Sequence, residues 1–266
     1  MTLEGRREAA VNFRLATWNV NSLKVRLPHL LDWLSAASPD VVCLQETKTE
    51  DANFPRRELE QAGYHAVYCG QKAYNGVAIL SRKPIADVAH GIPDFPDDPK
   101  RAIAATIDGM RIVCLYAPNG EEPGSDKYAY KLRWYTALSR WLRDEQAAWP
   151  GLAVLGDMNV APEDRDVHNP KRWGGKIHVS APEREALRMV LDTGLADAFR
   201  LFAQPEKMFS WWDYRLKAFE RGWGLRIDHI LLAPALAPKC AACVIDTEPR
   251  KRERPSDHAP VIAELS

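Results

Sequence analysis

Polar residues suited to binding a cation or a phosphate group follow several apolar segments of this chain, at the point where each segment ends. In chain order they are Asn19, Glu46, Tyr116, Asp157, Asn159, Asp228, Asp257 and His258. Side chains at strand ends line one rim of a β-sandwich, which is a common place for a site on a rigid scaffold. Mg²⁺ prefers a few carboxylates together with water and substrate phosphate oxygens. The pattern therefore predicts a magnesium site at a sheet rim.

An acid and an imidazole stand side by side between two prolines near the C-terminus, in the segment RPSDHAP at 254–260. Taken alone, this segment is typical of a polar turn, since Ser and Asp suit turns and Pro interrupts regular structure. Asp228, however, lies within an apolar strand predicted for 225–232, where an unpaired acid is costly. A neighbouring imidazole would stabilise it. His258 is the first candidate, although His229 competes on sequence alone.

The composition is that of an ordinary globular protein, with 46% hydrophobic and 27% charged residues and a formal net charge of zero. A net charge of zero gives no overall basic field for a polyanion, although a local basic patch could bind one. The five cysteines do not resemble a disulfide framework, and the pair Cys240 and Cys243 supplies only two of the ligands that a structural zinc needs. Because we find no secretory signal and no long apolar run, we expect a cytoplasmic protein that crosses no membrane.

Short apolar runs predict many strands and few helices. The predicted strands span 14–18, 41–44, 76–81, 102–107, 111–116, 152–155, 225–232 and 259–265, and helical spacing predicts helices over 26–37 and 127–148. A third helix follows Ser180, which forms a capping-box pattern with Glu183, and Gly194 is placed to close it. Strands that follow one another through short turns argue against an alternating barrel. The sequence favours an α/β sandwich, in which two β-sheets pack face to face with helices outside.

Eight motifs occur in an order that resembles a known family. They are WNVNS (18–22), LQETK (44–48), NGVAILSR (75–82), YAPNG (116–120), GDMNVAP (156–162), SWWDYR (210–215), GLRIDHILL (224–232) and SDHAP (256–260). Together they resemble the exodeoxyribonuclease III family of apurinic/apyrimidinic (AP) endonucleases, within the wider endonuclease/exonuclease/phosphatase superfamily. The resemblance extends from Phe13 to Leu265. We therefore expect a poorly ordered extension at 1–12 and a single catalytic domain at 13–266.

The resemblance implies a four-layer α/β sandwich of two mixed sheets, and cleavage of DNA phosphodiesters that depends on Mg²⁺, with Mn²⁺ as a possible substitute. Glu46 would be the main metal ligand, helped by Asn19 and Asp257, and Asp157 would activate or orient the attacking water. The residues that we expect around the metal are Asn19, Glu46, Asp157, Asn159, Asp257 and His258.

The same resemblance implies how the substrate is held. Asn159 and His258 would bind the scissile phosphate, and Asp228 would orient His258. The full catalytic set implied is Tyr116, Asp157, Asn159, Asp228 and His258. Lys127 would contact a phosphate, although Lys131 is close by in the sequence, and Trp211 would line the pocket for an abasic sugar.

Aromatic and basic residues alternate in the segment SWWDYRLKAFERGWGLR at 210–226, and further basic residues occur at 167–175 and 249–254. The rings could simply cover the sandwich. Alternatively, they could stack against a flipped or abasic nucleotide while the basic groups hold phosphates. These local clusters of basic residues could bind DNA even though the net charge of the whole chain is zero.

The sequence therefore predicts a monomeric DNA-repair nuclease that cleaves double-stranded DNA 5′ to abasic sites and at 3′ ends. One alternative is a phosphoesterase of the same superfamily that acts on a small molecule such as an inositol phosphate. That enzyme would share the metal residues but would have no need for the aromatic–basic segment. A second alternative is a non-catalytic nucleic-acid-binding module. The presence of all the expected metal and phosphate residues argues against it.

Overall fold

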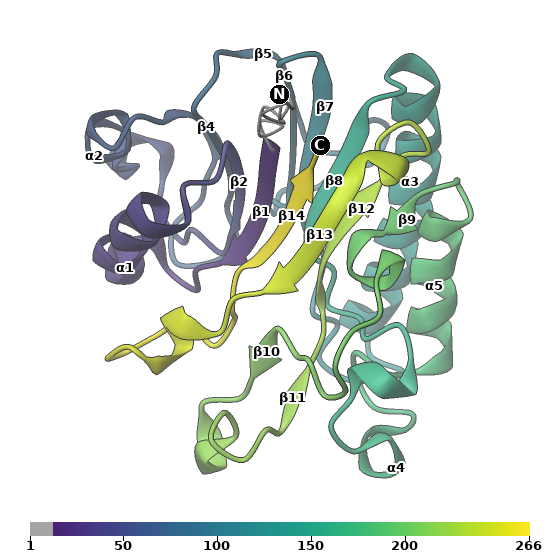
Figure 1. The fold of residues 1–266 in the computed structure, drawn as a ribbon. Helices are drawn as coiled ribbons and strands as arrows, with labels where there is room; N and C mark the ends of the chain where they lie inside the picture. The colour runs from purple at the N-terminus through teal and green to yellow at the C-terminus, as the bar shows by residue number, and fades with distance from the viewer. Residues whose placement is uncertain (1–12) are drawn as a thin grey trace, which may run out of the picture.

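Two mixed six-stranded sheets form the centre of the molecule in the computed structural model, which describes residues 13–266 (Figure 1). The expected extension at 1–12 lies outside the described residues. The first sheet has the order β13 (Cys240–Ile245), β14 (Val261–Leu265), β1 (Phe13–Asn19), β2 (Val41–Gln45), β4 (Val77–Ser81) and β3 (His65–Cys69). The second has the order β5 (Ile85–His90), β6 (Ala102–Ile107), β7 (Met110–Tyr116), β8 (Leu152–Asp157), β12 (Asp228–Leu232) and β9 (Ala196–Asp197). The pairs β1–β2 and β7–β8 are parallel, and the other pairs are antiparallel.

Alternate residues of the central strands pack to opposite sides, as the two-residue period of a strand requires. In β1, Leu15 packs between the two sheets, whereas Ala16 and Trp18 pack outward with residues of α1 (Leu23–Ala37). On the other side, α3 (Asp126–Ala148) and α5 (Ala181–Leu191) cover the outer face of the second sheet. The layers are therefore helix, sheet, sheet and helix. The predicted four-layer α/β sandwich is confirmed.

The expected third helix is capped as its sequence predicts. The hydroxyl of Ser180 and the carboxylate of Glu183 form a reciprocal capping box at the start of α5. The helix ends at Leu191, and Gly194 then takes a left-handed backbone conformation (φ 105°) in the following turn. Between residues 13 and 266, no helix combines the length and the apolar character that a bilayer crossing requires.

The predicted strand at 225–232 is wrong as a single element. Gly224–Leu225 forms the short strand β11, which pairs with β10 (Trp211–Trp212), and β12 begins only at Asp228. The strand is interrupted between them because the backbone N–H of Arg226 donates to the carbonyl of Asp166 and not to a neighbouring strand. Asp228 is thus the first residue of its strand and not an interior one. Strands β3, β5 and β13 were not predicted; all three are partly exposed, and neither β3 nor β5 shows a regular alternation of buried and exposed residues.

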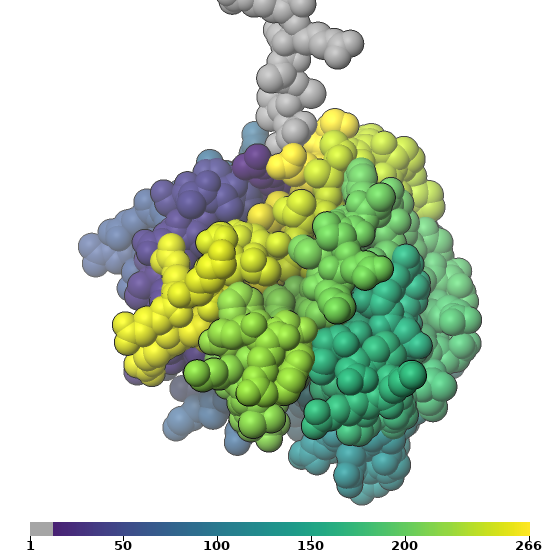
Figure 2. Space-filling model, turned by 60° about the horizontal axis from the view of Figure 1, so that its bottom comes forward, coloured from purple at the N-terminus to yellow at the C-terminus, as the bar shows by residue number. Residues whose placement is uncertain are grey.

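Three segments come together on one face, at the rim where β8 and β12 meet. Figure 2 shows the segments around α4 (Pro170–Trp173), the β10–β11 loop and the basic stretch 249–256 side by side on that face. The remaining short helices of the described chain are α2 (Arg56–Gln61), η1 (Asp51–Asn53), η2 (Asp164–Asp166), η3 (Ala198–Leu201), η4 (Arg215–Lys217), η5 (Ala237–Lys239) and η6 (Glu248–Lys251). The three converging segments include the aromatic–basic segment and both basic stretches singled out in the sequence.

Candidate active site

Strand register brings the predicted residues of each sheet into a row. In the second sheet, Asp157 pairs with Tyr116 on one side and with Asp228 on the other. In the first sheet, Asn19 pairs with Gln45, so Glu46 follows directly at the same rim. The two sheets pack face to face, and their rows therefore meet across the sandwich.

Asn19 joins the two rows through its amide. Its Nδ2 donates to Glu46 Oε1 at 2.8 Å and to Asp157 Oδ2 at 3.0 Å. Its Oδ1 accepts from the backbone N–H of Asn21 at 2.9 Å, which fixes the orientation of the amide. Asn19 therefore turns its donor side toward the carboxylates and holds them together. Its role as a metal ligand stays a prediction, since its oxygen faces Asn21 in this arrangement.

His258 is the partner of Asp228. Its Nδ1 lies 2.8 Å from Asp228 Oδ2, and its Nε2 lies 3.8 Å from Asp157 Oδ2. Burial lowers the pKa of His258, but the negative charges of Asp228 and Asp157 outweigh it and raise the pKa from 6.5 to about 10. The competing candidate, His229, bonds instead to Arg226 and to the carbonyl of Val160. Of the two imidazoles considered from the sequence, the structure pairs His258 with Asp228.

Glu46, Asp157 and His258 each offer one ligand atom, and these atoms all lie within 4.8 Å of one another. Burial raises the pKa of Asp157 from 3.8 to about 7, so its ionised form needs a nearby positive charge. A cation already approaches Glu46, because Lys48 Nζ lies 2.8 Å from its Oε2. Two carboxylates in such a setting fit a hard divalent cation.

Asp257 is engaged by neighbouring side chains. Its Oδ1 accepts from Asn21 Nδ2 at 2.9 Å, and its Oδ2 accepts from Trp211 Nε1 at 3.0 Å. It does not belong to the cluster formed by Glu46, Asp157 and His258. The structure therefore gives Asp257 a second connection, to the aromatic–basic segment, and its role as a metal ligand remains a prediction.

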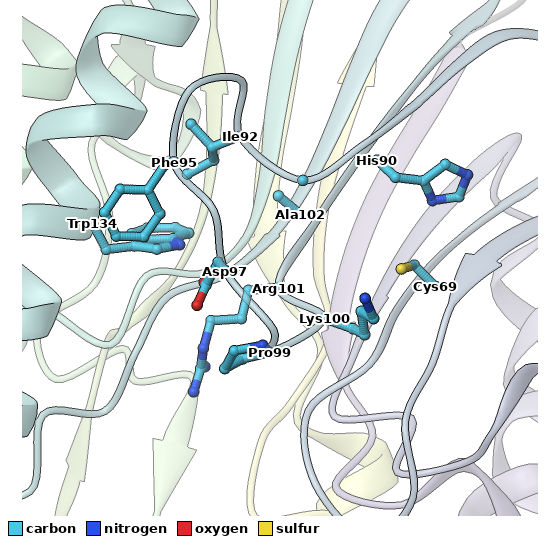
Figure 3. A pocket seen from close by; sticks show the side chains of 11 residues that line it. Cys69, His90, Ile92, Phe95, Asp97, Pro99, Lys100, Arg101, Ala102 and Trp134 are labelled. Atoms are coloured by element: carbon cyan, nitrogen blue, oxygen red, sulfur yellow. The ribbon is translucent and has the colours of Figure 1, made fainter.

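Tyr116 and Asn159 supply hydrogen-bond donors beside the carboxylates. Burial raises the pKa of Tyr116 well above 10, with the charges of Glu46 and Asp157 adding to it, so the phenol keeps its proton. The guanidinium of Arg101 lies 5.0 Å from the centre of the Tyr116 ring. Arg101 is also one of the residues that line a pocket of about 130 Å³ (Figure 3). Asn159 adopts a left-handed φ of 51°, and its Nδ2 donates to the carbonyl of Ala117 at 2.9 Å.

A buried polar cluster behind Asn159 was missed from the sequence. Lys131 Nζ and His178 Nδ1 both lie 2.7 Å from the carbonyl oxygen of Asn159. Glu183 completes the cluster, because its Oε1 lies 2.5 Å from Lys131 Nζ and accepts a hydrogen bond from the backbone N–H of His178 at 2.9 Å. Burial and the charge of Lys131 lower the pKa of His178 to about 4, so its imidazole is neutral at pH 7.

Lys127 and Lys131 have different surroundings. Lys127 is exposed and pairs with Glu121, outside the row of site residues, whereas Lys131 is fully buried. The structure therefore does not bring Lys127 to the carboxylates. Any phosphate contact by Lys127 remains a prediction.

Trp211 is tied to the segment SDH by main-chain and side-chain contacts. Trp211 and His258 form an antiparallel bridge, and the N–H of Trp212 donates to the carbonyl of Asp257 at 3.0 Å. The Trp211 ring also contacts Trp173 and His178, with ring centres 6.5 and 6.2 Å away. The aromatic–basic segment is thus attached directly to the carboxylates and the imidazole.

Residues 16–258 match the sequence profile of the endonuclease/exonuclease/phosphatase family. The chain belongs to this family. It is 37% identical to exodeoxyribonuclease III of Haemophilus influenzae over 95% of this chain and 99% of that protein. Among solved structures, it is similar to a 3′ phosphatase from Neisseria bound to product DNA hairpin, with a TM-score of 0.94, 45% identity and coverage of 96% of this chain and 99% of that one. It is also similar to an AP endonuclease from Archaeoglobus fulgidus, with a TM-score of 0.91, 39% identity and coverage of 96% and 99%.

These matches confirm the predicted relationship to the exodeoxyribonuclease III family. The protein is therefore a DNA-repair nuclease, a hydrolase that depends on a metal ion and acts on DNA phosphodiesters. The prediction of a nuclease is confirmed, and the alternative of a non-catalytic binding module is not supported.

Proposed function

We propose that this nuclease removes blocking groups and nucleotides from the 3′ ends of duplex DNA, using Mg²⁺ or Mn²⁺. The observation that carries the proposal is the convergence of Glu46, Asp157 and His258 at one rim, with the Asp228–His258 pair directly behind. The Neisseria relative, described as a 3′ phosphatase, is 45% identical, and the Archaeoglobus AP endonuclease is 39% identical. A second Neisseria structure, 46% identical, is described as a 3′-5′ exonuclease, and the two descriptions together support 3′-end processing as the main activity.

The proposed reaction is hydrolysis at phosphorus. A water oxygen bonds to the phosphorus, the bond between phosphorus and the 3′ oxygen breaks, and the 3′ oxygen leaves as a hydroxyl after taking a proton. A terminal phosphate is then released as inorganic phosphate, and a terminal nucleotide as a nucleoside 5′-monophosphate. Incision 5′ to an abasic site breaks the same type of bond, so we propose it as a second activity of this site.

The residues contribute through charge, orientation and hydrogen bonds. A divalent cation held by Glu46 and Asp157, with Asn19 and Asp257 as further predicted contributors, would supply Lewis-acid stabilisation of the phosphate. Asp157 is suited to orient the attacking water or to take its proton, because its carboxylate lies at the rim between Asn19 Nδ2 and His258 Nε2.

Donors beside these carboxylates would stabilise the negative charge that develops on the phosphate. Asn159, Tyr116 and His258 would donate to its oxygens, which is where donors fixed in advance contribute most to a rate. Asp228 would keep the Nε2 of His258 directed at the phosphate. None of these roles requires a covalent intermediate.

The test compares three labelled duplexes: one with a recessed 3′-phosphate, one with an unmodified recessed 3′ end and one with an internal abasic analogue. The wild-type protein with Mg²⁺ or Mn²⁺ should act on the first two faster than on the third, and EDTA should abolish all three reactions. Glu46→Gln should be deficient on every duplex. If the wild type cleaved no duplex with either metal, or cleaved them equally well in EDTA, the proposal would be wrong. If the protein hydrolysed inositol phosphates but no DNA duplex, the small-molecule alternative would be supported.

A further inference from the structure

Arg250 is a buried arginine without an acidic partner. It lies in η6 and is 6% exposed. Within residues 13–266 it forms no ion pair and its Nε has no hydrogen-bond partner, whereas Arg252 in the same basic stretch pairs with Asp32. Burial lowers the pKa of Arg250, and the negative charge of Asp257 partly offsets this effect. A buried charge is costly unless it is paired, so stability alone does not explain this arginine.

Three rings of the β10–β11 hairpin surround the guanidinium. Its central carbon lies 5.7 Å from the centre of the Trp212 ring, 5.9 Å from that of Tyr214 and 4.9 Å from that of Phe219. Aromatic faces attract a cation at such distances. Figure 2 shows the basic stretch 249–256 beside this hairpin. The hairpin therefore holds the side chain of a residue that belongs to a different segment.

The same guanidinium contacts the turn that carries the segment SDH. Arg250 Nη1 donates to the carbonyl of Ser256, directly before the acid and the imidazole. The preceding carbonyl, that of Pro255, accepts from Arg26 Nη2 at 3.0 Å. Two consecutive carbonyls of the turn are thus held by guanidinium groups from two different segments. The acid and the imidazole extend from this backbone, so their positions depend on it.

We propose that Arg250 is a positioning residue, whose guanidinium holds the segment SDH against the β10–β11 hairpin and so keeps the His258 imidazole beside Asp228. This inference rests on the proposed role of His258 in hydrolysis. Arg250 acts through the backbone of the turn and not by contact with the reacting atoms. A planar guanidinium can stack on rings and donate hydrogen bonds from its edge at the same time, which an ammonium group cannot do in the same way.

Arg250→Met tests the role of the charge, because methionine can fill space among the rings but cannot donate to the Ser256 carbonyl. It should lower kcat on the 3′-phosphate duplex by roughly 10- to 150-fold, the range for loss of one hydrogen bond to a charged group. KM should change little, because the loss affects the geometry of the reacting groups and not the binding of DNA. Arg250→Lys keeps a cationic donor and should retain more of kcat than Arg250→Met.

Arg111→Met is the matched control. Arg111 is another buried arginine that lies against a ring, with its guanidinium 5.6 Å from the centre of Trp149, but it is paired with Glu145. It lies near the start of β7, whereas Tyr116 ends that strand at the site. Arg111→Met should therefore lower the free energy of unfolding, because Glu145 loses its partner, and should leave kcat unchanged.

Hydrogen exchange followed by NMR tests the same contact without any use of activity. The backbone N–H groups of Trp212 and Ala259 donate to the carbonyls of Asp257 and Ser210, between the hairpin and the turn. Both amides should exchange faster in Arg250→Met, whereas the amides in the interior of β8 should exchange as in the wild type. A residue that contributed only to overall stability would accelerate exchange in β8 as well.

A wild-type kcat in Arg250→Met would overturn the inference, as would unchanged exchange of the two amides between the hairpin and the turn. If Arg250→Met did not fold, the same two measurements on Arg250→Lys would decide, and wild-type values for both would overturn the inference. If His258→Asn had the kcat of the wild type, the proposed role of His258 would be wrong instead. In that case the exchange of the two amides would still show whether Arg250 holds the turn.

Discussion

The pairing of Asp228 with His258 makes a quantitative prediction about catalysis. Asp228→Asn replaces the carboxylate that lies 2.8 Å from His258 Nδ1 by an uncharged group of the same size. A hydrogen bond to a charged group contributes about 1.5–3 kcal/mol, which corresponds to a loss of roughly 10- to 150-fold in rate. Because the effect acts through the imidazole, Asp228→Asn should lower the rate little further in a protein whose His258 is already replaced.

The assay is a double-mutant cycle of single-turnover cleavage on the 3′-phosphate duplex, with Asp228→Asn, His258→Asn and the double variant. The two losses should be strongly non-additive, with a coupling energy of about 0.5–3 kcal/mol. Asp197→Asn is a matched control, because Asp197 is a partly buried acid on the neighbouring strand β9 that pairs with Arg226 and not with His258. Asp197→Asn should lower the free energy of unfolding, and its effect on the rate should be additive with that of His258→Asn. Additive losses for Asp228 and His258, in variants whose thermal unfolding is cooperative, would refute the reasoning.

Three further predictions concern the surrounding residues. Lys131→Met should lower the free energy of unfolding in urea by about 3–5 kcal/mol, because it leaves Glu183 buried without its ion-pair partner. Lys127→Ala breaks only an exposed ion pair and should change the free energy of unfolding by less than about 1 kcal/mol, so equal losses in the two variants would contradict the prediction. Because the pKa of His178 is about 4 in the folded state and 6.5 in the unfolded state, the free energy of unfolding should fall as the pH drops from 6.5 to 4. At pH 4.5 the wild type should have lost about 2–3 kcal/mol more of it than His178→Asn, and parallel pH profiles of the two proteins would contradict this prediction. Trp211→Phe should retain more activity than Trp211→Ala on the abasic duplex, because a ring remains and only the hydrogen bond to Asp257 is lost; equal rates for the two variants would show that the ring does not matter.

The sequence could predict the rim residues because a strand has a two-residue period and ends at a recognisable polar residue. Asn19, Tyr116, Asp157 and Asp228 are each the first or last residue of a strand, so their neighbours follow from strand pairing once the fold is known. The resemblance then supplied what the period cannot, namely that these residues surround one metal and that Asp228 orients His258. Asp228 was placed inside its strand and is in fact its first residue, because the bond from Arg226 to Asp166 interrupts the ladder.

The buried cluster behind Asn159 could not be predicted in the same way. Lys131 lies within a helix, where a single lysine is usually exposed, and His178 lies in a loop without a recognisable motif. Glu183 was identified as part of a capping box, and that role is confirmed, but nothing in a capping box indicates that the same carboxylate also binds a buried lysine. The orientation of the Asn19 amide was equally hidden, because it depends on the backbone N–H of Asn21.

The segment SDH explains why an acid and an imidazole stand together between two prolines. Ser256 Oγ donates to the carbonyl of Asn19 at 2.6 Å, Asp257 accepts from Trp211, and His258 pairs with Asp228. Consecutive residues thus connect the rim of the first sheet, the β10–β11 hairpin and the rim of the second sheet. A shift of this turn would move the imidazole and the Trp211 ring together, because both are fixed to the same backbone.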